Sequence, residues 1–244
     1  MEHPKLRDSK RLLTHEPYPI NEIPEEIIRK IGCRLVYMLC IGRSDLAGND
    51  WGDIFAEVIG GEHFNSPVGV ADVAVDKMAW SLKTVKHKKP FCNGISLRLI
   101  SGRCSPDYSY GITDPHEDVQ KTGRAVLNIW NERVNIAFDY YNTVRTIVLV
   151  RGEDMLSYSL FEQDIHRYPA NLYSWKENRN GNLIGYEIET EKQRFTWQPH
   201  GSQLTIHTQL PSNAIKFRIK QPPILNMEDT LKQINYDDSW VEIL

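Results

Sequence analysis

The sequence predicts an α/β fold in which a mixed central β-sheet is flanked by helices and the C-terminal half is rich in strands. Three observations favour this class. Apolar residues recur at helical spacing near residues 24–42, 51–59 and 115–138. Runs rich in β-branched residues, at 68–89 and 143–150, predict strands between and after these helices. Beyond them, strand-like segments alternate with turn residues.

Length and composition indicate a globular protein. The chain has 244 residues, of which 41% are hydrophobic and 25% charged, so it is long enough to bury a sizeable core. Residues 1–20 are polar and interrupted by proline, and we expect them to form an N-terminal arm. Residues 21–244 are expected to form a single domain, with a core at about 45–151 and a β-rich part at about 152–244.

Capping residues set the expected helix boundaries. Pro24 is suited to open the first helix. Asp50 is expected to cap the second helix, which ends at the glycine pair 60–61. Asp114 followed by Pro115 predicts the start of the third helix. Each helix carries an apolar stripe, which we interpret as a face buried in the core.

Strand signals fill the rest of the chain. The run 143–150 follows a long helix, so we expect a crossover and a parallel strand pair. Further strands are expected at 95–100, 158–168, 185–191, 203–208 and 214–220. The last two are expected to pair as a hairpin, and the Asn-Gly pair at 180–181 predicts a tight turn.

Composition and motifs exclude several classes of protein. The net charge is −3, so local basic runs would have to attract any nucleic acid. The four cysteines lack Cys-x-x-Cys spacing and are expected to be reduced thiols. We find no apolar run of membrane-spanning length and no signal-peptide pattern, and therefore expect a soluble cytoplasmic protein. Zinc, ATP and dinucleotide motifs are absent from the sequence.

The segment 68–89 carries the most informative pattern. It predicts a hairpin that turns at residues 76–77 and places Asp72 opposite Ser81. Because side chains alternate between the two faces of a strand, Asp72, Ser81 and Lys83 would share one face, and the other face would pack on the core. An acid and a lysine that converge on open space suit metal-assisted phosphodiester hydrolysis. An ordinary solvated hairpin can carry the same two residues.

These residues resemble the PD-(D/E)XK nuclease superfamily, and within it the type II restriction endonucleases. The match consists of Asp72 and, eleven positions later, Lys83 in Trp-Ser-Leu-Lys, preceded by an acidic helix at 49–61. It covers about residues 45–151, which would be the catalytic core, and the β-rich part after it would recognise DNA. The resemblance implies a restriction-endonuclease-like fold in which Asp72 binds Mg²⁺ and Lys83 activates or orients the attacking water.

One position departs from the superfamily pattern. Ser81 stands two residues before the lysine, where the pattern has Asp or Glu. We expect Glu57 of the acidic helix to complete the metal site, with Asp53, on the same helical face, as second choice. The Ser81 hydroxyl could still orient a water molecule. The number of metal ions stays open.

Basic and polar side chains outside the hairpin are candidates for DNA contacts. A lysine run follows the hairpin and suits phosphate binding. Arg103 lies among small hydroxyl residues, which suits contact with phosphates or a guanine edge. The polar face of the third helix could meet DNA or a second subunit, and the loop 196–203 is rich in hydrogen-bonding groups. The candidates are Lys86, Lys88, Lys89, Arg98, Arg103, Ser105, Arg124, Gln198, His200 and Gln203.

The expected function, as the resemblance implies, is Mg²⁺-dependent, site-specific cleavage of double-stranded DNA. It also implies a homodimer on a palindromic site, since twofold protein symmetry matches twofold DNA symmetry. A cognate DNA methyltransferase is expected in the same system, though not as a stable partner. The alternatives are a repair or nicking nuclease of the superfamily and a DNA-binding protein that has lost catalysis.

Overall fold

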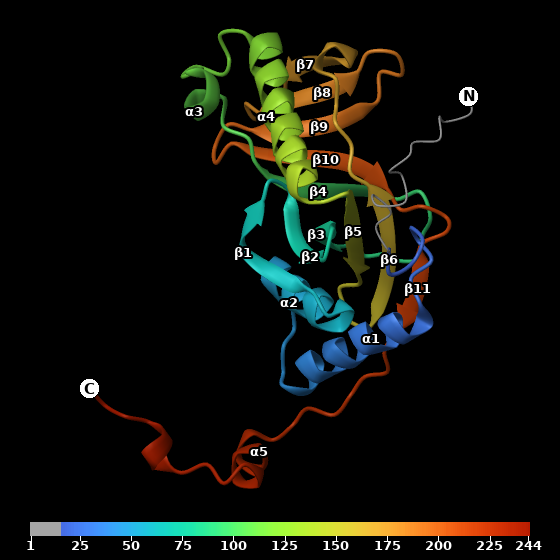
Figure 1. The fold of residues 1–244 in the computed structure, drawn as a ribbon, viewed down its shortest axis with the longest axis vertical. Helices are drawn as coiled ribbons and strands as arrows, with labels where there is room; N and C mark the ends of the chain where they lie inside the picture. Colours follow the sequence, from blue (N-terminus) through green and yellow to red (C-terminus); the bar gives the residue numbers. More distant parts are fainter. Residues whose placement is uncertain (1–15) are drawn as a thin grey trace, which may run out of the picture.

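Five α-helices and eleven β-strands make up residues 16–244, which the computed structural model describes (Figure 1). The helices are α1 (Glu25–Cys40), α2 (Gly48–Ile59), α3 (Pro106–Tyr110), α4 (Val119–Tyr140) and α5 (Met227–Gln233). The strands are β1 (Glu62–Val68), β2 (Ala71–Val75), β3 (Met78–Lys86), β4 (Ser96–Arg103), β5 (Thr143–Arg151), β6 (Ser157–Asp164), β7 (Tyr173–Glu177), β8 (Leu183–Glu187), β9 (Gln193–Gln198), β10 (Gln203–Gln209) and β11 (Ile215–Arg218). The expected α/β class and strand-rich C-terminal half are confirmed. None of the helices in this part of the chain combines the length and apolar character needed to cross a membrane.

The strands form two sheets. A six-stranded sheet has the order β1-β2-β3-β5-β6-β11, in which β3 and β5 run parallel and the other pairs antiparallel. This is the mixed sheet, with the parallel pair, that the sequence predicts. A five-stranded antiparallel sheet has the order β4-β10-β9-β8-β7 and lies above the first sheet in Figure 1. The sequence analysis does not predict this second sheet as a separate layer.

Helices α1 and α2 cover one face of the six-stranded sheet. Their buried residues form one apolar cluster with Val73, Trp80 and Ile147 from three of its strands. The Phe55 ring of α2 meets the Trp80 ring edge-on, with 5.4 Å between the centroids. The apolar face expected for the hairpin is therefore confirmed, and it fixes the hairpin against α2.

Helix α4 and the second sheet cover the opposite face. Leu127 and Trp130 of α4 belong to an apolar cluster that includes Trp175 and Phe195 of the second sheet. Another cluster joins Leu99 of β4 to residues of β5 and β6 in the first sheet. Apolar side chains thus tie the two sheets and α4 into one layered body (Figure 1).

Residues 16–23 lie on the six-stranded sheet. Tyr18 and Ile23 are buried, and the Tyr18 hydroxyl donates to Glu162 Oε1 across 3.1 Å. Arg145 Nη1 lies 3.2 Å from Glu162 Oε2 and donates to the Tyr18 carbonyl. The last residues of the arm expected at 1–20 are therefore held against the sheet, and residues 1–15 lie outside the described part of the chain.

Two helix starts differ from the expectation. Asp50 lies inside α2, and its carboxylate accepts the backbone N–H of Ala47, the N-cap residue. Helix α4 begins after Asp118, whose side chain accepts the Lys121 N–H. The expected cap Asp114 accepts a backbone N–H two residues later, in a separate turn. Several acids near each start can accept such bonds, and the sequence does not rank them.

The hairpin expected from 203–208 and 214–220 is wrong. Strand β10 pairs with β4 and β9 in the second sheet, whereas β11 pairs with β6 at an edge of the first. Strands β1, β7 and β9 have no counterpart in the expected set, and β9 includes the first residues of the expected loop 196–203. Alternation along a strand gives its faces but not its partner, so these pairings escape sequence analysis.

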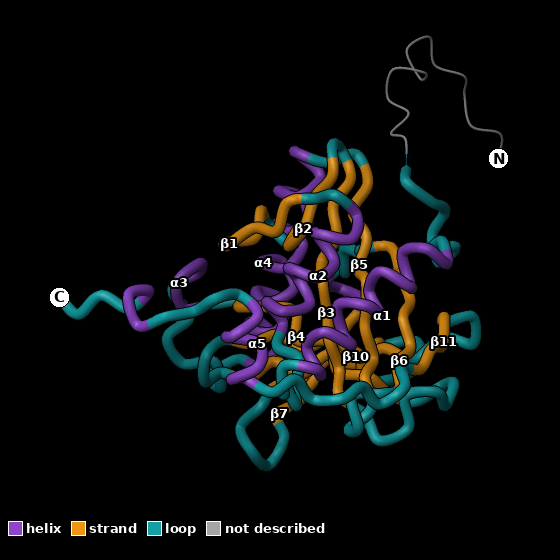
Figure 2. The backbone as a smooth tube through the Cα atoms, turned by 90° about the horizontal axis from the view of Figure 1, so that it is seen from below, coloured by secondary structure: helices purple, strands orange, loops and turns teal. Residues whose placement is uncertain are grey.

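After β11 the chain leaves the body. The Leu225 N–H donates to the Cys40 carbonyl at the end of α1, and no residue of the following helix α5 is buried. Figures 1 and 2 show, from two directions, that this terminal segment points away from the edge strand β11.

Candidate active site

The hairpin of β2 and β3 turns at Asp76 and Lys77, as expected. Asp76 has a φ of 50°, a left-handed conformation that Asp adopts more readily than most residues. Ala74 lies opposite Ala79, which confirms the expected register. Two residues further along each strand, this register brings Asp72 beside Ser81.

Three side chains on this face contact one another. The Ser81 hydroxyl donates to Asp72 Oδ2 across 3.3 Å, and the Leu82 backbone N–H donates to the same oxygen across 2.7 Å. Lys83 Nζ donates to Ser81 Oγ and to the Leu82 carbonyl, at 2.9 Å each. It also lies 3.5 Å from Asp72 Oδ2. The structure thus brings Asp72, Ser81 and Lys83 together.

These residues line a cavity of about 240 Å³ between the hairpin, the start of α2, strand β4 and helix α4. Asn49 forms part of one wall, and Ser101 part of another. The Asp72 side chain is 24% exposed and that of Lys83 14%. The cavity has room for several water molecules beside polar groups that can bind them.

Burial lowers the pKa of the Lys83 ammonium from its ordinary value. The Asp72 carboxylate offsets part of this effect because it stabilises the charged form, whereas the Arg133 guanidinium lowers the pKa further. Lys83 therefore gives up its proton more readily than a solvated lysine does, which suits a role beside an attacking water.

Arg133 of α4 also lines the cavity, and the sequence analysis misses it. Its Nε donates to the Gly69 carbonyl across 3.2 Å and its Nη1 to the Ser101 carbonyl across 3.1 Å. These bonds hold the guanidinium between the β1–β2 turn and β4. Arg133 lies three residues after Trp130, so it falls beside the apolar stripe of α4. A cation beside an apolar stripe needs a polar partner in the fold. The presence of an arginine at such a position is the sequence signal that could have pointed to Arg133.

Neither Glu57 nor Asp53 lines the cavity. Glu57 is 55% exposed and forms an ion pair with Arg34 of α1. Asp53 Oδ1 lies 2.7 Å from Nδ1 of His63, and it is His63 that lines the cavity. The start of α2 lines the cavity, but neither of these two acids does. Asp53 is connected to the cavity through His63, a residue of β1 that the sequence analysis does not single out.

The oxygen atoms around Asp72 fit a hard divalent cation. Mg²⁺ is often bound through one or two carboxylates, while water and phosphate oxygens complete its octahedral shell. Asp72 supplies a carboxylate, Ser81 a hydroxyl and Leu82 a carbonyl, and the Lys83 ammonium contacts all three. Within residues 16–244 no group of three or more His, Cys, Asp and Glu is placed to hold a metal ion. A metal ion here would take most of its ligands from water and substrate.

Five DNA-contact candidates meet at one end of the second sheet. Gln203 of β10 lies opposite Arg103 of β4 and opposite Gln198 of β9. Ser105 hydrogen-bonds to the β9–β10 turn, which also holds His200. We call these five residues the sheet-end group. Strand β4 runs from the cavity wall into Arg103, so the sheet-end group adjoins the cavity.

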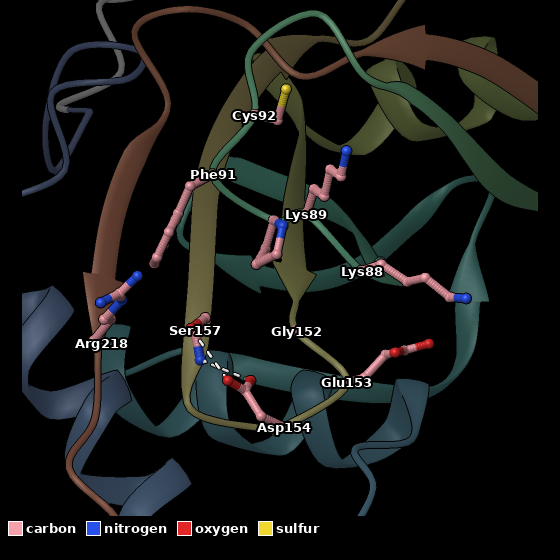
Figure 3. Close-up of a pocket in the computed structure, with 10 residues that line it drawn as sticks. Lys88, Lys89, Phe91, Cys92, Gly152, Glu153, Asp154, Ser157 and Arg218 are labelled. Carbon is pink, nitrogen blue, oxygen red and sulfur yellow. Dashed lines mark hydrogen bonds between the residues drawn. The ribbon is translucent and has the colours of Figure 1, made fainter.

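The other candidates lie apart from the sheet-end group. Lys88 and Lys89 line a separate pocket of about 620 Å³ (Figure 3). Figure 3 shows their side chains pointing in different directions, while Arg218 is directed at Phe91, with 4.9 Å between the guanidinium and the ring centroid. The remaining candidates are exposed: Lys86, Arg98 and Arg124.

Comparison with known proteins gives no relative. No family model, curated protein or solved structure matches the chain. The resemblance of the hairpin to the nuclease superfamily therefore stays a prediction, and the functional argument depends on the residues and geometry of the site.

Proposed function

We propose that the protein is a Mg²⁺-dependent endonuclease that cleaves double-stranded DNA at specific sites, in the manner of a type II restriction enzyme. The observation that carries the proposal is the mutual contact of Asp72, Ser81 and Lys83 at one small cavity. Arg133 adds a guanidinium to the cavity wall, and the sheet-end group adds polar and basic side chains beside it. Metal-assisted phosphodiester hydrolysis uses a carboxylate for the metal ion, a group that handles a proton and a cation for the phosphate.

Each residue has a role in the proposed reaction. Arg133 holds the scissile phosphate and offsets the negative charge that develops on its oxygens. Lys83 orients the attacking water and accepts its proton, which the lowered pKa favours. Asp72 anchors Ser81 and Lys83 through Oδ2 and holds the ion. Attack at phosphorus breaks the bond to the 3′ oxygen, which takes a proton from a water molecule, and leaves a 5′-phosphate and a 3′-hydroxyl. Mg²⁺, when bound, supplies polarisation of the phosphate and a more acidic water.

Double-stranded DNA is the proposed partner, bound by a homodimer on a palindromic site. The net charge of −3 requires that local cations such as Arg103 attract the DNA. We place the activity in the cytoplasm, in a system with a DNA methyltransferase that modifies the same sites without binding the nuclease stably.

Plasmid cleavage tests the proposal. Purified protein is incubated with plasmid DNA and Mg²⁺, and in parallel with EDTA, and cleavage is expected only with Mg²⁺. Asp72→Asn and Lys83→Met are each expected to lower the single-turnover rate by about 10²–10³-fold or more. Lys77→Ala is the matched control, because Lys77 is exposed in the turn of the same hairpin. Full activity in either site variant, with circular dichroism showing an intact fold, would remove the proposed site.

A DNA-binding protein without catalysis is the second candidate function. It is favoured by one observation: Asp72 is the only carboxylate of the described residues that lines the cavity. The same experiment separates the candidates. Discrete linear fragments favour restriction, nicked circles favour a nicking or repair nuclease, and binding without cleavage favours the inactive protein.

A further inference from the structure

The last 19 residues, 226–244, form a C-terminal arm that leaves the body of the protein (Figures 1 and 2). Within the arm, the Tyr236 and Trp240 rings meet edge-on with 5.7 Å between their centroids. The exposed large apolar side chains of the arm are Met227, Ile234, Trp240, Val241, Ile243 and Leu244. Several exposed apolar side chains on one short segment favour a contact surface.

An apolar groove of about 630 Å³ lies between α1 and β11. Partly buried side chains form its floor, among them Ile28, Ile215 and Phe217. Strand β11 is an edge of the six-stranded sheet and, within residues 16–244, pairs with β6 alone. Its outer backbone groups are therefore free to pair with an added segment.

The arm and the groove have opposite charge. The arm carries five acidic side chains and one basic side chain, Lys232, which gives a net charge of −4. Arg29, Lys216 and Arg218 border the groove, with one acid, Glu25, so the net charge of its rim is +2. Arg29 is paired with Glu25, whereas Lys216 donates to Asn93 and Arg218 is directed at Phe91. Complementary charges of this kind steer association and set the orientation of the partners.

We propose that the C-terminal arm docks in the α1–β11 groove of a second copy of this chain, and that two copies exchange arms in a closed pair. A second copy suits the structure better than the same chain, because both views show the arm directed away from its own β11 edge (Figures 1 and 2). In such a pair each copy contributes its arm and its groove. Their residues together amount to about the 20–30 that each partner contributes to a standard interface. The inference rests on the homodimer proposed above and names its interface, but it does not depend on the nuclease activity.

Sedimentation of the full chain tests the pairing. The unmodified protein is expected to sediment at twice its chain mass of 28.3 kDa. Trp240→Asp is expected to raise the dimer Kd at least about tenfold, because a carboxylate would enter an apolar groove. Gln233→Asp adds the same charge at an exposed polar position of the arm and is expected to keep the dimer. A monomeric unmodified chain, or a Trp240→Asp variant that stays dimeric, overturns the proposal.

Disulfide trapping locates the arm. Cys33 lines the groove and is exposed, so it reports on any cysteine that docks there. Met227→Cys, Ile234→Cys and Trp240→Cys are made singly and oxidised. At least one is expected to give a covalent dimer on a non-reducing gel, and Cys33→Ser in the same background is expected to abolish it. A cross-linked monomer, which places the arm in its own groove, or no link to Cys33 at all, overturns the proposal.

Discussion

At the scale of single residues, the Lys83 ammonium is surrounded by the three oxygen atoms of Asp72, Ser81 and Leu82. A divalent cation at Asp72 would use the same oxygens. Two cations this close repel each other, so the charged ammonium opposes binding of the ion. Removal of the ammonium should therefore make the oxygens a better metal site, even as it removes a group on which the proposed catalysis depends.

Lys83→Met is accordingly expected to bind Mn²⁺, as a probe for Mg²⁺, more tightly than the unmodified protein. Repulsion between unit charges about 4 Å apart amounts to roughly 1 kcal/mol even in bulk water, so it is about 2 kcal/mol for a divalent ion, or about a thirtyfold gain in affinity. Isothermal titration without DNA measures it, and Asp72→Asn, which removes the carboxylate charge, is expected to bind more weakly than either. Equal or weaker binding by Lys83→Met would show that the ammonium and the ion do not compete.

Glu57→Gln is expected to retain DNA cleavage, because Glu57 pairs with Arg34 outside the cavity. An exposed ion pair contributes about 0–1 kcal/mol, so urea denaturation should show a change no larger than that. The assay is the single-turnover cleavage rate, compared with that of Asp72→Asn. A decrease in the cleavage rate as large as that of Asp72→Asn would indicate that Glu57 does contribute to the metal site.

The part of the site that the sequence predicts is the part that lies close together in the chain. Asp72, Ser81 and Lys83 fall within twelve residues, and strand alternation across a two-residue turn is enough to place them on one face. Arg133 and His63 reach the same cavity from α4 and β1. Their approach depends on how these elements pack on the hairpin, which no local pattern contains.

At the scale of elements, a buried ion pair attaches residues 16–23 to the six-stranded sheet. The side chains of Arg145 and Glu162 are 3% and 0% exposed. Burial raises the pKa of Glu162, and hydrogen bonds from Trp80 and the charge of Arg145 oppose the increase. The charged carboxylate therefore depends on keeping these partners.

Arg145→Met is expected to lower the free energy of unfolding by about 3–5 kcal/mol, because it leaves Glu162 buried without its countercharge. Urea denaturation followed by circular dichroism measures the change. Arg29→Met is the control: it breaks an ion pair with Glu25 whose side chains are 77% exposed, and about 0–1 kcal/mol is expected. Similar small effects in both variants would contradict the structural role of the buried pair.

Helix α4 is joined to the second sheet by close contact at Gly123. A Cβ atom at this position would lie 2.2 Å from Cγ of Trp175, whose ring is buried and cannot move aside. Gly123→Ala gains about 1 kcal/mol of helix propensity but overfills the contact at a cost of about 1–3 kcal/mol, so we expect net destabilisation. Gly32→Ala in α1 meets no atom within 4 Å and should stabilise the protein in the same urea assay. Stabilisation by both substitutions would mean that α4 packs more loosely than the structure has it.

The sequence predicts the existence of elements better than their ends and partners. The helix periods and the hairpin register follow from local alternation, and both are confirmed. Strand β1, with the sequence Glu-His-Phe-Asn-Ser-Pro-Val, has an irregular burial pattern and gives no alternating signal. Strands β10 and β11 are neighbours in sequence but belong to different sheets, since their partners are set by contacts over long distances in the chain.

At the scale of the whole molecule, the two sheets share apolar clusters. Leu97 and Leu99 of the second sheet pack with Val148, Val150 and Phe161 of the first. A cluster that spans both sheets couples their stability, since neither sheet keeps its buried surface without the other.

The body of the protein, residues 21–225, is therefore expected to unfold in one cooperative transition, as a single domain does. Urea curves from circular dichroism and from tryptophan fluorescence should coincide, because Trp80 reports on the first sheet and Trp175 on the second. Hydrogen exchange of β3 and β9 should give the same highest opening free energy. Two separate transitions would show two independent domains.

Strand β4 has a consequence for how such an enzyme could change its target. It carries Ser101 and Gly102 in the cavity wall and Arg103 in the sheet-end group, with no spacer between them. If the protein cuts DNA as proposed, this strand fixes the distance between the cleaved phosphodiester bond and the nearest base that the sheet-end group contacts. Substitutions at Arg103 or Gln203 would then change the preferred DNA sequence. The position of the cut relative to that sequence would stay the same.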